Sequence, residues 1–146
     1  MTRTRLLVVG AALLAIVGGG GWLHDPPWVA GLTGGMREWT EDPPGTRFRW
    51  TNGHATFFVP SDATVVTLPL RAGFPGPDGT PVTVQVSVDD RWLAEVSLPD
   101  PAAWVRTEVP MPRRPTSRRF RRIDLRVSRT VGPSILGVQI GELVLR

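Results

Sequence analysis

The chain has 146 residues, a formal net charge of +4 and no cysteine, and all 17 of its basic residues are arginine. Because cysteine is absent, the sequence excludes a disulfide scaffold, a cysteine-ligated zinc site, a thiol nucleophile and a lipidated cysteine. One domain is expected at this length, and the 15 prolines and 16 glycines favour an all-β domain of short elements joined by turns.

The N-terminus carries an uncharged apolar run, LLVVGAALLAIVGGGGWL, at residues 6–23. As a helix it would be about 27 Å long, close to the ~30 Å hydrocarbon core of a bilayer. Arg3 and Arg5 precede the run, and no basic residue follows until Arg37. The positive-inside rule therefore predicts a cytoplasmic N-terminus and a domain on the extracytoplasmic, periplasmic side of a cell membrane.

A cleaved signal peptide is the alternative for residues 1–24, because a basic start, an apolar stretch and small residues near Gly18 follow the same pattern. Cleavage would make the protein secreted. Trp22 and Trp28 are placed like interfacial anchors and favour a retained helix. Residues 25–45 contain DPP, GLTGG and EDPPG, which predict a juxtamembrane linker.

From residue 46 onward the apolar residues alternate with polar ones. In PVTVQVSVDD, four valines from Val82 to Val88 point to one side, as in a half-buried antiparallel strand. Similar segments are 47–51, 55–59, 64–70, 92–98, 104–109, 122–128 and 135–145. About eight strands separated by turn sequences predict an antiparallel β-sandwich or jelly roll over residues 46–146.

Local sequence predicts details of these strands. Asp89 and Asp90 are expected to form a tight hairpin, and Asn52-Gly53-His54 a turn. Gly137 and Gly141 indicate a bulge in the last strand, because the apolar phase shifts between them.

The segment RRPTSRRFRRIDLRVSR, residues 113–129, holds eight arginines. Its second half alternates like a strand, so Arg122 and Arg126 should stand on the outer face of a sheet. Four others, Arg113, Arg114, Arg118 and Arg119, should lie on a Pro-bounded loop. Nucleic acid is not predicted as a partner, because only Phe120 interleaves with the arginines and no groove-entering helix is present. Three explanations of the arginine cluster remain: it binds anionic lipid headgroups, it binds an acidic glycan, or it is a solvated rim without a ligand.

Catalytic residue types are scarce. His24 falls in the linker and His54 in the predicted turn, without evident triad partners, and Asp89 and Asp90 are better explained as turn residues. Acidic residues at loops or strand ends, where a jelly roll can hold Ca²⁺, have no diagnostic spacing; they are Asp62, Asp78, Asp100 and Glu142. The sequence therefore predicts no enzyme, no cofactor and no metal.

Tryptophan suggests a different chemistry, because an exposed indole can stack on the apolar face of a sugar. Trp50, Trp92 and Trp104 could equally close the ends of the core, whereas Trp39 is flanked by charged residues and should be exposed. The candidate ligand-binding residues are Trp39, Arg49, Trp92, Arg119 and Arg126.

Three runs, FRWTNGHATFFVP, TLPLRAGFPGPDGTPVTVQVSVDDR and RRIDLRVSRTVGPSILGVQIGELVLR, carry a family resemblance. They resemble the small galactose-binding or carbohydrate-binding-like β-sandwich domain that accompanies bacterial membrane glycosyltransferases and occurs in membrane-anchored hypothetical proteins. The resemblance spans about residues 46–146 and implies a jelly roll without chemistry of its own. The matching positions are Arg49, Trp50, Thr51, Val88, Asp89, Arg91, Leu136, Gly137 and Val138.

Two departures from this family concern the hairpin and the ligand site. Asp90 stands where the hairpin of the family usually has glycine. Residues 132–135, Gly-Pro-Ser-Ile, replace the acidic and arginine residues that often precede the final Leu-Gly-Val and would be expected to meet a ligand.

The sequence thus predicts a non-catalytic, membrane-anchored β-sandwich of the cell envelope that binds glycan or an anionic envelope polymer. It would assist polysaccharide or glycosyl-transfer machinery, with a membrane glycosyltransferase as a candidate partner. The alternative is a structural module that docks onto a membrane complex without binding glycan. A hydrolase would need two carboxyl groups about 5–10 Å apart in a cleft. Convergence of tryptophan and arginine on an open groove would favour glycan binding.

Overall fold

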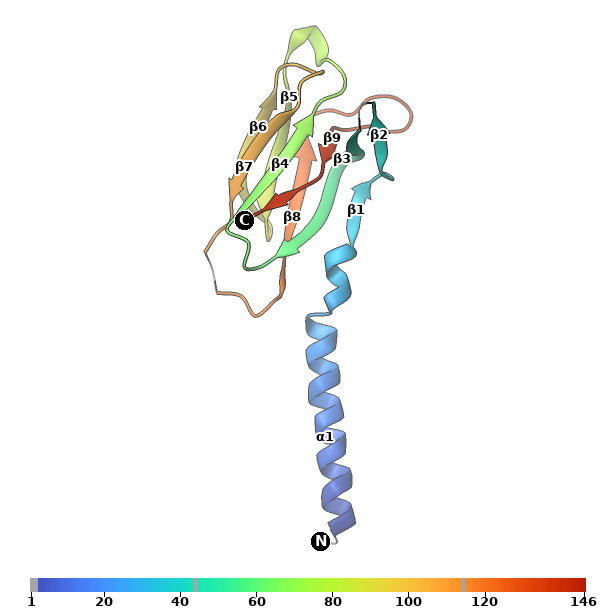
Figure 1. Cartoon of the computed structure of the whole chain (residues 1–146), viewed down its shortest axis with the longest axis vertical. Helices are drawn as coiled ribbons and strands as arrows, with labels where there is room; N and C mark the ends of the chain where they lie inside the picture. The colour runs from blue at the N-terminus through green and yellow to red at the C-terminus, as the bar shows by residue number, and fades with distance from the viewer. Residues whose placement is uncertain (1–2, 44, 114) are drawn as a thin grey trace.

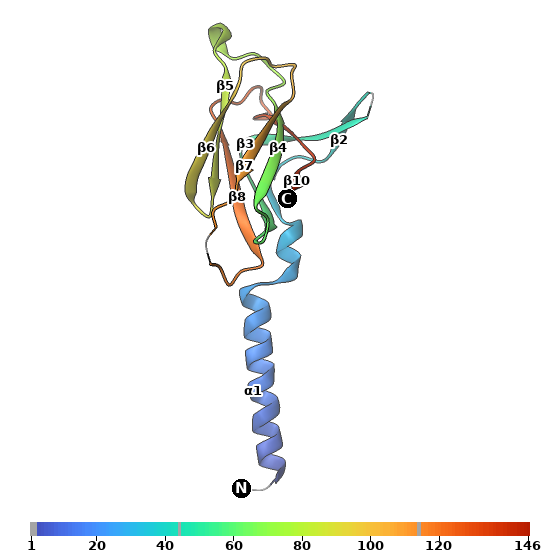
Figure 2. The same ribbon diagram turned by 60° about the vertical axis from the view of Figure 1, so that its left-hand side comes forward.

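The apolar N-terminal run forms helix α1 (Arg3–His24) in the computed structural model, which describes residues 3–43, 45–113 and 115–146. The helix points away from the β-structure (Figures 1 and 2), and its leucines and valines are largely exposed. By length and composition the stretch Leu7–Gly31 could cross a membrane, although a signal sequence would pass the same test.

The rest of the chain is an antiparallel β-sandwich preceded by a short 3-10 helix, η1 (Pro27–Gly31). Sheet A contains, in order, β1 (Thr33–Met36), β3 (Thr46–Pro60), β8 (Phe120–Val127), β5 (Val82–Val88) and β6 (Arg91–Leu98). Sheet B contains β2 (Thr40–Asp42), the first part of β3, β9 (Gln139–Gly141), β4 (Val65–Arg71) and β7 (Val105–Pro110), and β10 (Val144–Leu145) pairs with β4. All pairings among the described residues are antiparallel, so the predicted fold class is confirmed, with ten strands in that part of the chain in place of about eight.

The core lies between the two sheets and follows the alternation seen in the sequence. Val82, Val84, Val86 and Val88 are at most 2% exposed. Ile123 and Leu125 of β8 and alternate residues of β4 are fully buried beside them. Because each buried Val, Leu or Ile side chain contributes about 1.5–3 kcal/mol, this alternation supplies much of the free energy that holds the sheets together.

The sequence predicts a turn at Asn52-Gly53-His54. The structure instead shows this segment inside the continuous strand β3. Gly53 has a φ of +73°, a conformation that glycine adopts readily. The strand can therefore bend there without ending. Residues before this point pair with β9, and residues from His54 onward pair with β8, so one strand serves both sheets.

The segment 25–45, predicted as a linker, contributes β1 and β2 to the sheets. Thr33 pairs with Phe57 and Met36 with Thr51. The Gly- and Pro-rich sequence of this segment does not predict these strands, because they show no apolar alternation of their own. They are held by backbone hydrogen bonds to β3. The division of the chain into 1–24, 25–45 and 46–146 itself stays a prediction, and Pro44 and Arg114 lie outside the described residues.

The C-terminal strand predicted over 135–145 is divided. A single bridge joins Val131 to Leu136, and β9 and β10 are separated by Glu142 and Leu143. The two-residue hairpin between β5 and β6 is confirmed, since Asp89 and Asp90 have φ values of 49° and 64°.

Candidate functional site

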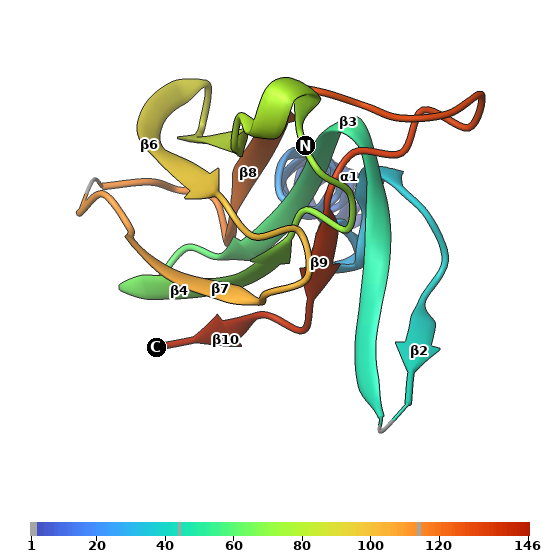
Figure 3. The same ribbon diagram turned by 90° about the horizontal axis from the view of Figure 1, so that it is seen from above.

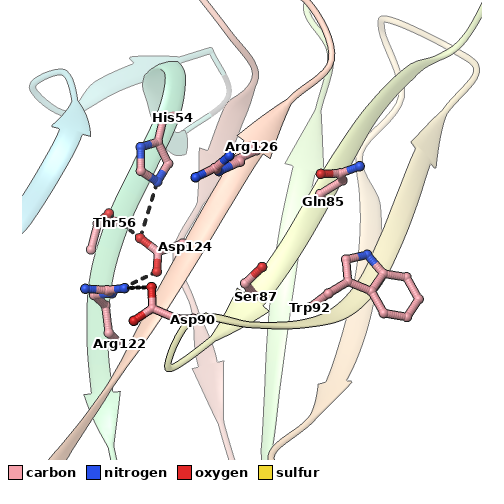
Figure 4. A pocket seen from close by; sticks show the side chains of 9 residues that line it. All are labelled: His54, Thr56, Gln85, Ser87, Asp90, Trp92, Arg122, Asp124 and Arg126. Atoms are coloured by element: carbon pink, nitrogen blue, oxygen red, sulfur yellow. Dashed lines mark hydrogen bonds and ion pairs between the residues drawn. The ribbon is translucent and has the colours of Figure 1, made fainter.

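A hollow of about 400 Å³ opens on the outer face of sheet A (Figure 4). Two rows of side chains cross its three central strands, His54–Arg126–Gln85 and Thr56–Asp124–Ser87. Period-two alternation places these side chains outward while Ile123 and Leu125 enter the core. The complete lining is His54, Thr56, Gln85, Ser87, Asp90, Trp92, Arg122, Asp124 and Arg126, which we call the sheet A groove.

Asp124 is the centre of a hydrogen-bonded network on one side of the groove. Its carboxylate accepts hydrogen bonds from Thr56 Oγ1 at 2.6 Å and from Arg122 Nε at 2.8 Å, and His54 Nε2 lies 3.3 Å away. Arg122 also pairs with Asp90 in the hairpin. These contacts fix the Arg122 guanidinium between two carboxylates from different elements (Figure 4).

The network favours the charged forms of Asp124 and Arg122. Burial alone would raise the pKa of Asp124, but the hydrogen bonds from Thr56 and Arg122 outweigh it and lower that pKa below its ordinary value. The hydrogen bond to Asp124 raises the pKa of Arg122. Asp124 is therefore an ionised hydrogen-bond acceptor, which is the opposite of what a general acid requires.

The other side of the groove carries side chains with free binding capacity. The Trp92 indole is 66% exposed. Among the residues that the structure describes, the Arg126 guanidinium has no hydrogen-bonding or ionic partner, and the Gln85 side chain makes only a long 3.5 Å contact from Nε2 to Glu95. A flat apolar surface, a guanidinium and an amide thus border one open hollow, a combination suited to a ligand with both an apolar face and polar substituents.

The predicted ligand-binding residues are divided among three places. Trp92 and Arg126 lie together in the sheet A groove. Trp39 and Arg49 lie together elsewhere, with the Arg49 guanidinium 5.2 Å from the indole centroid. Arg119 is on the loop before β8, where it pairs with Asp25. The structure therefore brings two of the five candidates into this groove.

Trp39 directly precedes β2, which forms with β3 a ribbon that extends away from the other strands (Figure 3). Its indole is 41% exposed and lies against the guanidinium groups of both Arg47 and Arg49. The Arg49 Nε donates to the carbonyl oxygen of Arg37 at 2.9 Å, which holds the ribbon to the chain before β2.

Trp50 and Trp104 are not exposed platforms but members of an aromatic cluster with Phe48 and Phe74. The Arg71 guanidinium lies 4.7 Å from the Trp104 ring centroid. This cluster borders a second hollow, on sheet B, of about 360 Å³, lined by Gly45, Thr46, Arg47, Pro69, Trp104, Arg106, Gly141 and Glu142.

Sequence reasoning missed most of the groove's polar lining. His54 was assigned to a turn, whereas it is a strand residue facing Asp124. Asp124 and Gln85 stand at outward positions of correctly predicted strands, so the alternation of apolar and polar residues predicts that their side chains point outward. The pairing of β8 with both β3 and β5 could not be deduced from the sequence. Among the described residues, no group of three or more His, Asp or Glu side chains is placed to hold a metal ion.

Comparison with known proteins yields no match to a family model and none to a curated protein. Among solved structures, the C-terminal CBM6 of a marine laminarinase from Zobellia galactanivorans is 14% identical, with 77% of this chain and 88% of that chain covered and a TM-score of 0.44. CsCBM6-3 from Clostridium stercorarium, solved with cellobiose, is 12% identical, with coverages of 78% and 85% and a TM-score of 0.45.

A family two carbohydrate esterase from Clostridium thermocellum, solved with cellohexaose, is 14% identical with a TM-score of 0.48. The match covers 79% of this chain but only 31% of the esterase. With TM-scores below 0.5, these structures assign the chain neither a family nor a ligand.

Proposed function

We propose that this protein is a membrane-anchored β-sandwich that binds glycan in the sheet A groove without transforming it. One observation carries the proposal: the exposed Trp92 indole lines the same hollow as the Arg126 guanidinium, which has no partner among the described residues. Sugars present an apolar face of C–H groups and a rim of hydroxyls, and the groove offers a complement to each.

In this proposal Trp92 stacks against the apolar face of a sugar ring, a contact worth about 0.5–1.5 kcal/mol beyond the area it buries. Arg126 and Gln85 then bind hydroxyl or carboxylate oxygens on the same ring. The Asp124–Arg122 network does not need to rearrange, because its charges already satisfy one another. Preorganisation of this kind lowers the entropic cost of binding.

The groove favours binding over hydrolysis. A glycosidase needs one carboxyl group with a raised pKa as general acid and a second as base or nucleophile. The groove contains two carboxylates, Asp90 and Asp124, but both pair with Arg122. The lowered pKa of Asp124 further disfavours a role as proton donor.

The proposal also includes the setting of the domain. Retention of α1 as an anchor, with the β-sandwich on the extracytoplasmic side, is supported by the exposed apolar surface of the helix and by Arg3 and Arg5 before it. A partner in envelope-polysaccharide or glycosyl-transfer machinery, such as a membrane glycosyltransferase, is supported by the sequence resemblance alone.

The test is binding of the full-length protein, in detergent micelles, to an array of neutral and acidic glycans. We expect Trp92→Ala to weaken binding at least about ten-fold, because it removes the aromatic surface on which the sugar would stack. Its melting temperature should be unchanged, since the side chain is 66% exposed. Trp39→Ala is the matched control and should retain full affinity.

Binding that survives Trp92→Ala but is lost in Trp39→Ala would move the site to the β2–β3 ribbon. If the protein binds none of the glycans, the second candidate function is favoured, in which the protein is a module that docks onto another protein. The observation in favour of that candidate is Trp39, an exposed indole that lies against the guanidinium groups of Arg47 and Arg49 just before β2. Aromatic and arginine side chains are the residues most often found at the centre of protein interfaces.

A further inference from the structure

Between β7 and β8, the described residues 111–113 and 115–119 lie at the end of the sandwich nearest α1 (Figures 1 and 2). It is bonded to the chain just beyond the helix. The backbone N–H of Arg119 donates to both carboxylate oxygens of Asp25, at 3.0 and 2.9 Å, and Arg119 Nε lies 3.4 Å from the same carboxylate. We call residues 111–113 and 115–119 the basic loop.

Asp25 couples this loop to the helix itself. Asp25 is the first residue after α1, and its own N–H donates to the carbonyl oxygen of Gly21, as in a continuing helical turn. Its side chain is 17% exposed, so the contact is well shielded from water. The basic loop is therefore held within one helical turn of the end of α1.

This geometry fixes where the loop would lie on an anchored protein. A helix rises about 1.5 Å per residue, so a span that ends near Leu23 places Asp25 in the headgroup region. Trp22 and Trp28 are each 55% exposed on either side of Asp25, where interfacial tryptophans are enriched. Arg119 and its neighbours would then face phosphate groups.

The charge of the loop suits that position. Arg113 and Arg118 are exposed and, among the residues that the structure describes, have no ion-pair partner; the Arg119 side chain is 68% exposed despite its pair. In the neighbouring hairpin, Asp90 pairs with the Arg122 guanidinium and Asp89 accepts a hydrogen bond from the backbone N–H of Arg122; both carboxylates line a small hollow together with Arg118.

The loop is also shaped from within. The buried Arg121 donates from Nη1 to the carbonyl oxygen of Pro112 at 2.6 Å, and the N–H of Ser61 donates to the carbonyl oxygen of Arg119 at 2.8 Å. The loop is thus fastened at both ends to the sandwich, and at Arg119 to Asp25. Its arginines need little reordering to meet a flat charged surface.

We propose that the basic loop binds anionic phospholipid headgroups and so fixes the orientation of the sandwich on the membrane. The inference rests on the membrane anchoring in the proposed function and is independent of glycan binding. Each arginine that reaches an anionic surface should favour the surface-bound orientation about five-fold. The attraction should be screened by salt, because the Debye length falls to about 3 Å at 1 M.

The absence of cysteine allows a clean test on the full chain. A fluorophore on Ser117→Cys would report the distance of the loop from a nitroxide-headgroup lipid present in trace amounts in nanodiscs. Discs of phosphatidylcholine alone would be compared with discs that also contain phosphatidylglycerol. A label on Ala102→Cys, in the β6–β7 connection at the opposite end of the sandwich, is the position control (Figure 1).

We expect stronger quenching at position 117 in the anionic discs than in the neutral discs, and no such difference at position 102. Replacing Arg113 and Arg118 by Gln together, or adding 1 M salt, should reduce quenching at 117 to the level of neutral discs. The matched control is Arg106→Gln with Arg129→Gln, which removes the same charge from elsewhere and should leave the difference intact.

Equal quenching in both kinds of disc, or equal loss in the two double variants, would overturn the inference while leaving the anchor intact. Alkaline carbonate extraction of the same preparations separates the two proposals. Release of the full chain by carbonate would overturn the anchoring, and with it the inference. An effect seen only after adding an acidic polysaccharide would assign the loop to a soluble polymer and would also overturn the lipid assignment.

Discussion

At the scale of single residues, Asp124 determines the geometry of the sheet A groove. It contacts three side chains from two strands, and one of them, Arg122, extends the network to the hairpin. A carboxylate on the outer face of a sheet would ordinarily be solvated, but Asp124 is only 9% exposed because its neighbours cover it. The network therefore links stability to pH.

Asp124→Asn should lower the free energy of unfolding at neutral pH by about 1–2 kcal/mol, because hydrogen bonds to a charged group are lost. The pKa of Asp124 is below 3.8 in the folded state, so its ionised form stabilises the fold above that ordinary value. This contribution is lost as the pH falls below about 4 toward the lowered pKa. Urea unfolding at several pH values should show that the wild type loses its advantage over the variant in acid.

Asp62→Asn is the control for this measurement, because Asp62 is exposed in a turn. It should leave both the stability and its acid dependence unchanged. A constant difference between wild type and Asp124→Asn across the acid range would show that the network does not depend on the charge of Asp124.

At the scale of elements, the crossing of β3 and the segment before β9 joins the two sheets. The buried Thr51 accepts from Gly137 N–H through its carbonyl oxygen at 2.7 Å, and its hydroxyl accepts from Val138 N–H at 2.9 Å. A Cβ at Gly137 would lie 2.5 Å from Thr51 Oγ1 and 2.7 Å from the backbone nitrogen of Gly53. Only glycine fits this close approach of two backbones.

Gly137→Ala should therefore destabilise the protein by about 1–3 kcal/mol, because the backbone of β3 must shift to admit a methyl group. Gly34→Ala is the matched control, since a Cβ there would meet Thr56 Cβ at an ordinary 3.8 Å. Its unfolding free energy should stay within about 0.5 kcal/mol of the wild type. Equal stability of the two variants in chemical denaturation would contradict this account of the crossing.

The same elements show how far the sequence determines the fold. β5 was predictable because its four valines meet the core in strict alternation. The turn predicted at Asn52-Gly53-His54 was wrong. Asn-Gly is a common hairpin sequence, which is why a turn was expected, but the pairing of His54 with Arg126 shows that the strand continues. β1 was missed because its stability comes from β3 and not from its own side chains.

The candidate site was predictable only in part, for a similar reason. Trp92 and Arg126 were singled out as residue types, and the structure places them in one groove. Their assembly depends on the order of strands β3, β8, β5 and β6, which brings residues 54, 92 and 126 together from distant parts of the chain. Alternation predicts which way a side chain points but not which strands are neighbours.

At the scale of the whole molecule, the sheet A groove and the basic loop adjoin. A smaller hollow of about 260 Å³ lies between the hairpin and the loop and is lined by Asp89, Asp90, Thr116, Arg118, Phe120 and Arg122. Arg122 and Asp90 line both hollows. The hairpin and the basic loop lie at the end of the sandwich that carries α1 (Figure 1). If α1 anchors the protein, a glycan in the groove would therefore lie toward the membrane.

Truncation tests where the folded unit begins. None of the most apolar window of the candidate membrane span is buried, so a chain that starts at Asp25 should keep the melting temperature of the full chain. A chain that starts at Glu38 lacks β1, which pairs with β3 from Thr33 to Met36, and exposes that edge of β3. Each 1 kcal/mol lost should lower the melting temperature by about 4–8 °C in a domain of this size. Scanning calorimetry of both shortened chains would measure their melting temperatures. Equal values would place the start of the folded unit after β1, as the sequence alone suggested.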